Sequence, residues 1–214
     1  GFEIDPNIEA AIRRIVEKPS GNLTESDFGQ VKVLDISHNL LHDLKGLDKL
    51  ENLEELGLSD NLLTGASFTQ KNFPLKRLNM KNNQLTEVNL ESLINLEILD
   101  LSENQLKEVK GLDKLTNLKY LNLSGNLLND IDLSKLTRLE ELDMAGNQLR
   151  RVKGIEQLKS LKTLNLGYNQ LTKLKPLKDL RHLERLCLIS NPELTKSQIF
   201  LLGSMLPKCK IEID

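Results

Sequence analysis

Asparagines recur along this chain at an almost constant spacing. The intervals between them are 22, 22, 21, 22, 21, 22 and 22 residues. Around each lies a pattern of the form L-x-x-L-x-L-x-x-N, as in LEILDLSEN at residues 96–104. Self-similarity at this period predicts a solenoid of stacked units that share one continuous core. The eight asparagines are Asn39, Asn61, Asn83, Asn104, Asn126, Asn147, Asn169 and Asn191.

Each repeat reads as a strand, a turn and a back segment. The two central leucines alternate with variable residues, which predicts a short strand with one buried face. Strands separated by about twenty residues stack in parallel through right-handed crossovers. The asparagine amide that follows can pair with backbone groups of its own turn and of the neighbouring repeat. Leucines spaced by three, such as Leu41, Leu44, Leu47 and Leu50, predict a 3₁₀-like back segment. Because strands pack more closely than these segments, we expect the strands on the concave side.

The repeats resemble those of leucine-rich repeat proteins, in the 22-residue class typified by internalins and by a phosphatase regulatory subunit. The resemblance covers about residues 31–194 and implies an α/β fold, a right-handed curved stack of eight repeats with a parallel concave β-sheet. Residues 1–30 resemble the N-terminal helical cap of bacterial surface members, and residues 195–214 their C-terminal helical cap. We expect one continuous domain, because open solenoid ends would expose leucines and strand edges.

Helix starts can be recognised in both predicted caps. Asp5 precedes Pro6 as an N-cap, and Thr24 with Asp27 forms a capping-box pattern. Residues 195–198 form another. The apolar stripes predicted to face the core are Ile8, Ile12, Ile15 and Val16 in the first cap, and Ile199, Leu202 and Met205 in the last.

Composition limits the classes of partner. The net charge is −2 and no basic tract stands out, so the sequence predicts binding neither to nucleic acid nor to an anionic membrane surface. No apolar run approaches 18 residues, so no membrane insertion is expected. Cys187 and Cys209 would lie three residues out of step if the last residues stack as a strand, about 10 Å apart. Two free thiols are therefore expected, with a disulfide as the less favoured alternative.

A second period lies beneath the first. The residue after the first apolar position of each pattern alternates in charge, which predicts a row of opposite charges across the stacked strands. We hypothesise that this row fixes the register of the stack. The alternative is a solvated edge inherited by duplication of a pair of repeats. The row is Lys32, Glu54, Lys76, Glu97, Lys119, Glu140, Lys162 and Glu184.

Candidate binding residues are the outward strand positions that depart from the repeated pattern. Tyrosine and arginine contribute much of the energy of known interfaces. We predict that Arg77, Ile98 and Tyr120 belong to a protein-binding patch on the concave face, with Tyr168 on or beside it. A second candidate lies near the C-terminal cap and consists of Arg185, Cys187 and Ile189. Ordinary surface variation is the alternative for the patch, and contact with the cap is the alternative for the second candidate.

One repeat is irregular. Between Leu63 and Leu75 the expected leucines give way to TGASFTQKNFP. We expect Phe68 and Phe73 to fill the core there while the segment bulges on the convex side. A repaired insertion is favoured over a binding loop.

Catalytic and metal-binding patterns are missing from the sequence. His38 and His42 lie in a turn without partner ligands, so no metal site is predicted. Asp100 and Asp143 would lie two strands apart, about 10 Å, on a surface without a cleft. No phosphate-binding loop appears and no cofactor is expected. The sequence therefore predicts no enzyme and no catalytic residues.

The combined pattern favours a non-enzymatic scaffold that binds a protein partner through its concave face. Resemblance to capped bacterial members implies an extracellular or cell-surface protein, and we expect a monomer. One alternative is a cytoplasmic regulatory subunit that targets an enzyme such as a phosphatase. Another is a structural spacer within a larger surface protein.

Overall fold

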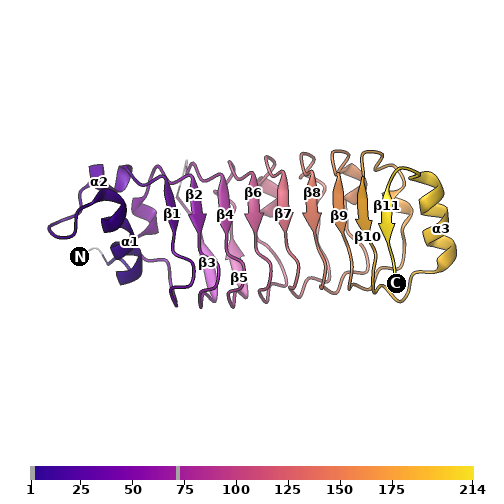
Figure 1. The fold of residues 1–214 in the computed structure, drawn as a ribbon, viewed down its shortest axis with the longest axis horizontal. Helices are drawn as coiled ribbons and strands as arrows, with labels where there is room; N and C mark the ends of the chain where they lie inside the picture. Colours follow the sequence, from indigo (N-terminus) through magenta and orange to yellow (C-terminus); the bar gives the residue numbers. More distant parts are fainter. Residues whose placement is uncertain (1–2, 71–72) are drawn as a thin grey trace.

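A computed structural model describes residues 3–70 and 73–214 of the chain. It is a solenoid whose front is a nine-stranded parallel sheet (Figure 1). Eight strands come from the eight repeats, as predicted, and the terminal segment adds a ninth. In spatial order the strands are β1 (Val33–Asp35), β2 (Glu55–Gly57), β4 (Arg77–Asn79), β6 (Ile98–Asp100), β7 (Tyr120–Asn122), β8 (Glu141–Asp143), β9 (Thr163–Asn165), β10 (Arg185–Cys187) and β11 (Lys210–Glu212).

Each repeat strand buries its central leucine and leaves the residues on either side partly or fully exposed. Leu99 and Leu121 are fully buried, and they are neighbours in the sheet register. Leucines of the turns and back segments complete each layer, and the layers join into one hydrophobic core along the stack. The predicted period of two therefore corresponds to a single buried face.

The repeat asparagines form a continuous internal row. In Asn61 the side-chain amide donates to the carbonyl of Ile36 in the preceding repeat and to Leu58 in its own turn. Its side-chain oxygen accepts from the backbone N–H of Leu41 at 3.0 Å. This is the double role predicted from the sequence. Asn39, in the first repeat, is only partly buried, and its side chain donates to Ser37.

The back of the solenoid is less uniform than predicted. Four repeats contain 3₁₀ helices, which confirms the leucine spacing there. Two others instead pair as a second parallel sheet of two strands, which turn Ala66 and Val88 inward. The sequence did not predict this sheet. The helices are η1 (Leu47–Lys49), η2 (Leu112–Lys114), η3 (Ile155–Gln157) and η4 (Lys175–Leu177), and the strands are β3 (Gly65–Ser67) and β5 (Glu87–Asn89).

The irregular repeat keeps its core filled by aromatic rings. Phe68 and Phe73 are buried and stack with ring centroids 6.5 Å apart. This confirms that phenylalanines replace the missing leucines. Residues 71–72 of the predicted bulge lie outside the described residues.

Helices cover both ends of the stack (Figure 1). They are α1 (Pro6–Val16), α2 (Glu25–Gly29) and α3 (Lys196–Met205). Asp5 caps α1, and both predicted capping boxes are formed, at Thr24 and at Thr195. The caps thus begin where the sequence predicts.

The predicted apolar stripes are only partly buried. In α1, Ile8 and Ile12 are buried with Ala11, and Val16 is partly buried against the core, but Ile15 is 44% exposed. In α3, Leu202 is buried, whereas Met205 is 46% exposed.

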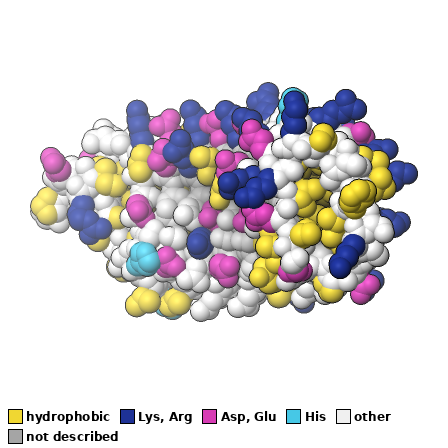
Figure 2. Space-filling view, turned by 45° about the vertical axis from the view of Figure 1, so that its right-hand side comes forward, with side chains coloured by type: hydrophobic (Ala, Val, Ile, Leu, Met, Phe, Trp, Pro, Cys, Tyr) yellow, Lys and Arg dark blue, Asp and Glu magenta, His cyan; other side chains and the backbone are white. Residues whose placement is uncertain are grey.

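Exposed apolar side chains gather at the C-terminal end, over α3 (Figure 2). Phe200 is 80% exposed and Leu201 56%. Phe200 and Leu201 thus present adjacent apolar side chains to solvent at this cap. None of the helices within residues 3–70 and 73–214 is long and apolar enough to cross a membrane.

Candidate partner-binding face

The concave face of the sheet presents two parallel rows of outward side chains. The residue before each central leucine forms the first row, and the residue after it forms the second. The strand register fixes the order within each row. The first row is Val33, Glu55, Arg77, Ile98, Tyr120, Glu141, Thr163, Arg185 and Lys210, and the second is Asp35, Gly57, Asn79, Asp100, Asn122, Asp143, Asn165, Cys187 and Glu212.

Three predicted residues are consecutive in the first row. Arg77 is the register partner of Ile98, and Ile98 is the partner of Tyr120. Together with Glu141 they line a shallow hollow of about 550 Å³. A second hollow, of about 240 Å³, continues from Tyr120 and Glu141 towards Thr163 and Arg185. Tyr120 therefore lies at the junction of two depressions on the sheet.

Partial burial changes the electrostatics at the centre of this face. It raises the pKa of Tyr120, whose hydroxyl is a neutral hydrogen-bonding group at physiological pH. Burial also raises the pKa of Asp143; the charge of Asp100 adds to this, and a hydrogen bond from the Ala145 backbone opposes it. The centre of the sheet is thus a partly desolvated surface with an aromatic ring beside carboxylates.

Arg185 occupies the same row but at a distance from Tyr120. Glu141 and Thr163 lie between them, and its register partner on the other side is Lys210 of the C-terminal cap. Arg185 thus lines the second hollow and also lies next to the C-terminal cap in the sheet. The cap register also pairs Cys187 with Glu212, so Cys209 lies three residues out of step, and both cysteines are free.

Tyr168 lies outside the rows, in the turn after β9. It is 63% exposed, and its backbone N–H donates to the carbonyl of Ile189. Its φ is +55°, a left-handed conformation that is unusual for a bulky residue. The same conformation occurs before every repeat asparagine: at His38, Asp60, Asn82, Glu103, Gly125, Gly146, Tyr168 and Ser190.

The alternating charges form a single row along one edge of this face. Backbone hydrogen bonds link Glu97 to Lys119 and Lys119 to Glu140 in consecutive repeats. Ion pairs form between Lys119 and Glu97 at 3.4 Å and between Lys162 and Glu140 at 3.1 Å. The predicted common row is confirmed, and in these pairs each lysine contacts the glutamate of the preceding repeat.

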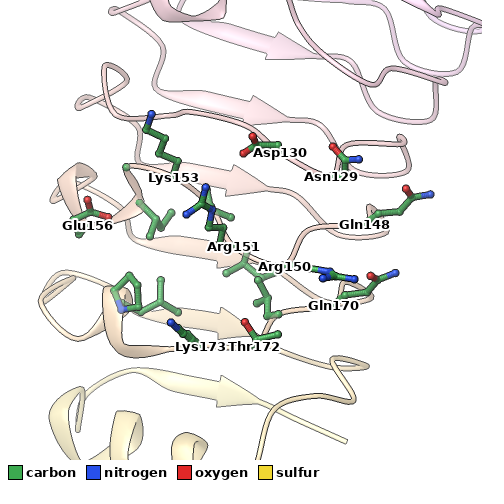
Figure 3. A pocket seen from close by; sticks show the side chains of 17 residues that line it. Asn129, Asp130, Gln148, Arg150, Arg151, Lys153, Glu156, Gln170, Thr172 and Lys173 are labelled. Atoms are coloured by element: carbon green, nitrogen blue, oxygen red, sulfur yellow. The ribbon is translucent and has the colours of Figure 1, made fainter.

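Sequence reasoning missed Glu141 and Thr163, which complete the two hollows. Nothing in the sequence distinguishes these two residues from other outward strand residues. Only the strand register shows that Glu141 is next to Tyr120 and that Thr163 follows Glu141. Sequence reasoning also missed a larger groove on another side of the coil, lined by Arg150 and Arg151 (Figure 3). Within the described ranges, no group of three or more His, Cys, Asp or Glu residues could hold a metal ion.

Family models agree with this geometry. The model of leucine-rich repeats in two copies matches residues 94–135, 116–158 and 137–182, and the single-repeat model matches residues 74–96. The chain is a leucine-rich repeat protein. A sequence search of curated proteins gives no match.

Among solved structures, this leucine-rich repeat protein is similar to internalin C2 from Listeria monocytogenes. The identity is 26%, the TM-score is 0.88, and the match covers 98% of this chain and 93% of internalin C2. A leucine-rich repeat protein from Leptospira interrogans matches at 29% identity and a TM-score of 0.49, over 87% of this chain and 62% of the other. The likeness to internalin C2 therefore includes the caps as well as the repeats.

Proposed function

We propose that this protein is a non-enzymatic scaffold that recognises a protein partner through its concave face. The contact is centred on Arg77, Ile98 and Tyr120, and it extends to Arg185 and Tyr168 at its C-terminal side. The observation that carries this proposal is the unbroken row from Arg77 through Ile98 to Tyr120 above one hollow. An aliphatic and an aromatic side chain between charged neighbours form the kind of anchor that interfaces use.

The proposal includes display or secretion by a bacterium. The support is the similarity to internalin C2 over nearly the whole of both chains. It also includes a monomeric state and the boundaries 1–30, 31–194 and 195–214 for cap, repeats and cap.

The experiment is affinity capture from host-cell extracts with three forms of the protein. Arg77→Ala plus Tyr120→Ala changes the proposed contact. Asp113→Ala plus Lys114→Ala changes two exposed residues of η2 on the back and serves as the matched control. We expect the intact protein and the control to capture the same partner and the first variant to lose it. Equal capture by all three forms would place the contact elsewhere.

A further inference from the structure

A groove larger than either hollow on the sheet lies on another side of the coil. It has a volume of about 920 Å³ and lies between the segments that follow Asn126, Asn147 and Asn169 (Figure 3). We call it the flank groove. Its labelled side chains follow one another across three successive coils: Asn129 and Asp130, then Arg150 and Arg151, then Thr172 and Lys173. Its volume is in the upper part of the range of small-ligand pockets.

The charge of one repeated position changes sign at this groove. The position is the fourth residue after each repeat asparagine. It is acidic or neutral through the first five repeats and basic in the next two. In order it holds Asp43, Gly65, Glu87, Glu108, Asp130, Arg151 and Lys173. The flank groove is therefore where this side of the solenoid becomes positive.

The cations in the groove are available to a ligand. The side chains of Arg150, Arg151 and Lys173 form no ion pair or hydrogen bond with the residues described, whereas Lys153 pairs with Asp132 at 3.7 Å. All of these cations are exposed. Asp130 and Glu156 are the acidic residues that line the groove, so positive charge is in excess.

The floor of the groove is apolar. Val152, Leu171 and Leu177 are buried beneath it and still form part of its lining. Gln148 and Gln170 offer neutral amides along one side (Figure 3). No aromatic side chain is among the lining residues, so bases of a nucleic acid would find no stacking surface.

We propose that the flank groove is a second binding site, separate from the sheet, for an extended acidic peptide segment. Arg150 and Arg151 bind its carboxylates through paired hydrogen bonds from their guanidinium groups, and the ammonium group of Lys173 adds a further positive charge. The apolar floor takes a side chain such as leucine or isoleucine. The glutamine amides bind peptide groups of the ligand backbone.

The test is selection from a phage-displayed library of random nonapeptides on the intact protein. We expect the selected peptides to be rich in aspartate and glutamate and to carry an aliphatic residue. Arg151→Glu plus Lys173→Glu should weaken their binding at least tenfold. Lys107→Glu plus Lys135→Glu, the same charge change at exposed lysines outside the groove, should leave binding within about twofold, as should Tyr120→Ala on the sheet.

Several results would overturn the proposal. They are the absence of any selected peptide, a selected set without acidic enrichment, or equal loss of binding in both charge-reversed variants. Binding of a twelve-residue oligothymidine as tight as that of the best peptide would contradict a peptide ligand. Dimerisation of the intact protein in sedimentation, abolished by Arg151→Glu plus Lys173→Glu, would mean that a second copy occupies the groove instead.

Discussion

The side-chain nitrogen of Asn126 lies 3.0 Å from the carbonyl oxygen of Leu101, which is 25 residues earlier in the chain. The same side chain donates to Leu123 in its own turn and accepts from the N–H of Leu106. One amide thus satisfies three buried backbone groups, two of them in the preceding repeat, and it also donates to the partly buried carbonyl of Ser124 at 3.3 Å. Repeated along the stack, this arrangement joins neighbouring coils where water cannot reach.

Replacement of Asn126 should therefore be costly. Asn126→Ala leaves three backbone groups without this partner, and unsatisfied buried groups cost about 1–3 kcal/mol each. We expect a loss of about 3 kcal/mol in the free energy of unfolding, measured by urea denaturation. Asn39→Ala, in the partly exposed first repeat, should cost about 1 kcal/mol. Similar losses for both variants would contradict the role of burial.

Two glycines should respond oppositely to alanine. Gly111 starts η2 at φ +86°, and an added Cβ would lie 2.4 Å from the backbone nitrogen of Glu91. Gly111→Ala should therefore destabilise the protein by more than about 2 kcal/mol. An added Cβ at Gly203, in α3, meets no atom within 4 Å. Gly203→Ala should stabilise by about 0.5–1 kcal/mol, because alanine loses less entropy in a helix. A stabilising Gly111→Ala, found by thermal melting, would disprove this packing.

Asp143 should lower stability at neutral pH. Burial raises the pKa of Asp143 in the folded protein, so folding favours its protonated form more than the unfolded chain does. Its stabilising contribution is full below the unfolded pKa of about 4 and is lost as the pH rises through the folded pKa. Asp143→Asn should raise the Tm by about 1–2 °C at pH 7 and have little effect at pH 3. Asparagine is compatible with the site, because Asn122 and Asn165 occupy the neighbouring positions in the row.

The matched control is Asp35→Asn, in the same row on the exposed first strand. It should not reproduce the pH-dependent gain. A constant difference in Tm between Asp143→Asn and the intact protein from pH 3 to pH 7 would refute the role of ionisation.

Substitutions in the row of alternating charges can test whether these charges help to fix the register of the stacked repeats. Glu97→Lys plus Glu140→Lys would place lysines beside Lys119 and Lys162 and remove both observed ion pairs. Exposed pairs are worth about 0–1 kcal/mol each, so we expect the Tm to fall by about 2–4 °C. Glu108→Lys plus Asp113→Lys, the same charge change outside the row, should have a smaller effect. Unchanged melting and a monodisperse protein in the first variant would favour the inherited-edge alternative.

Much of the fold could be predicted because each repeat carries the same local information. The alternation of leucines predicted where the strands lie, and the position of each asparagine predicted where the following turn begins. The back of the coil was harder, since Ala66 and Val88 pair as strands through contacts between repeats rather than through a local pattern. The left-handed conformation before each asparagine could not be predicted from the sequence either, because residues as different as Glu103 and Tyr168 adopt it. The geometry of the coil, not the residue type, imposes that conformation.

The candidate site could be predicted only in part. Arg77, Ile98 and Tyr120 stood out as departures from the repeated pattern, and the register places them side by side. Arg150 and Arg151 did not stand out, because the basic flank becomes visible only when equivalent positions of successive coils are compared. Exposure of Phe200 depends on how α3 rests on the last repeat, which periodicity alone does not determine.

Site-specific photo-crosslinking can show whether a partner contacts the concave face. Benzoylphenylalanine would replace either Ile98 on β6 or Lys114 on the back, and adducts formed in host-cell extract would be measured by mass spectrometry. We expect a specific adduct from position 98 that Arg77→Ala plus Tyr120→Ala abolishes, and none from position 114. An adduct formed only from position 114, or one from position 98 that survives both substitutions, would contradict recognition by this face.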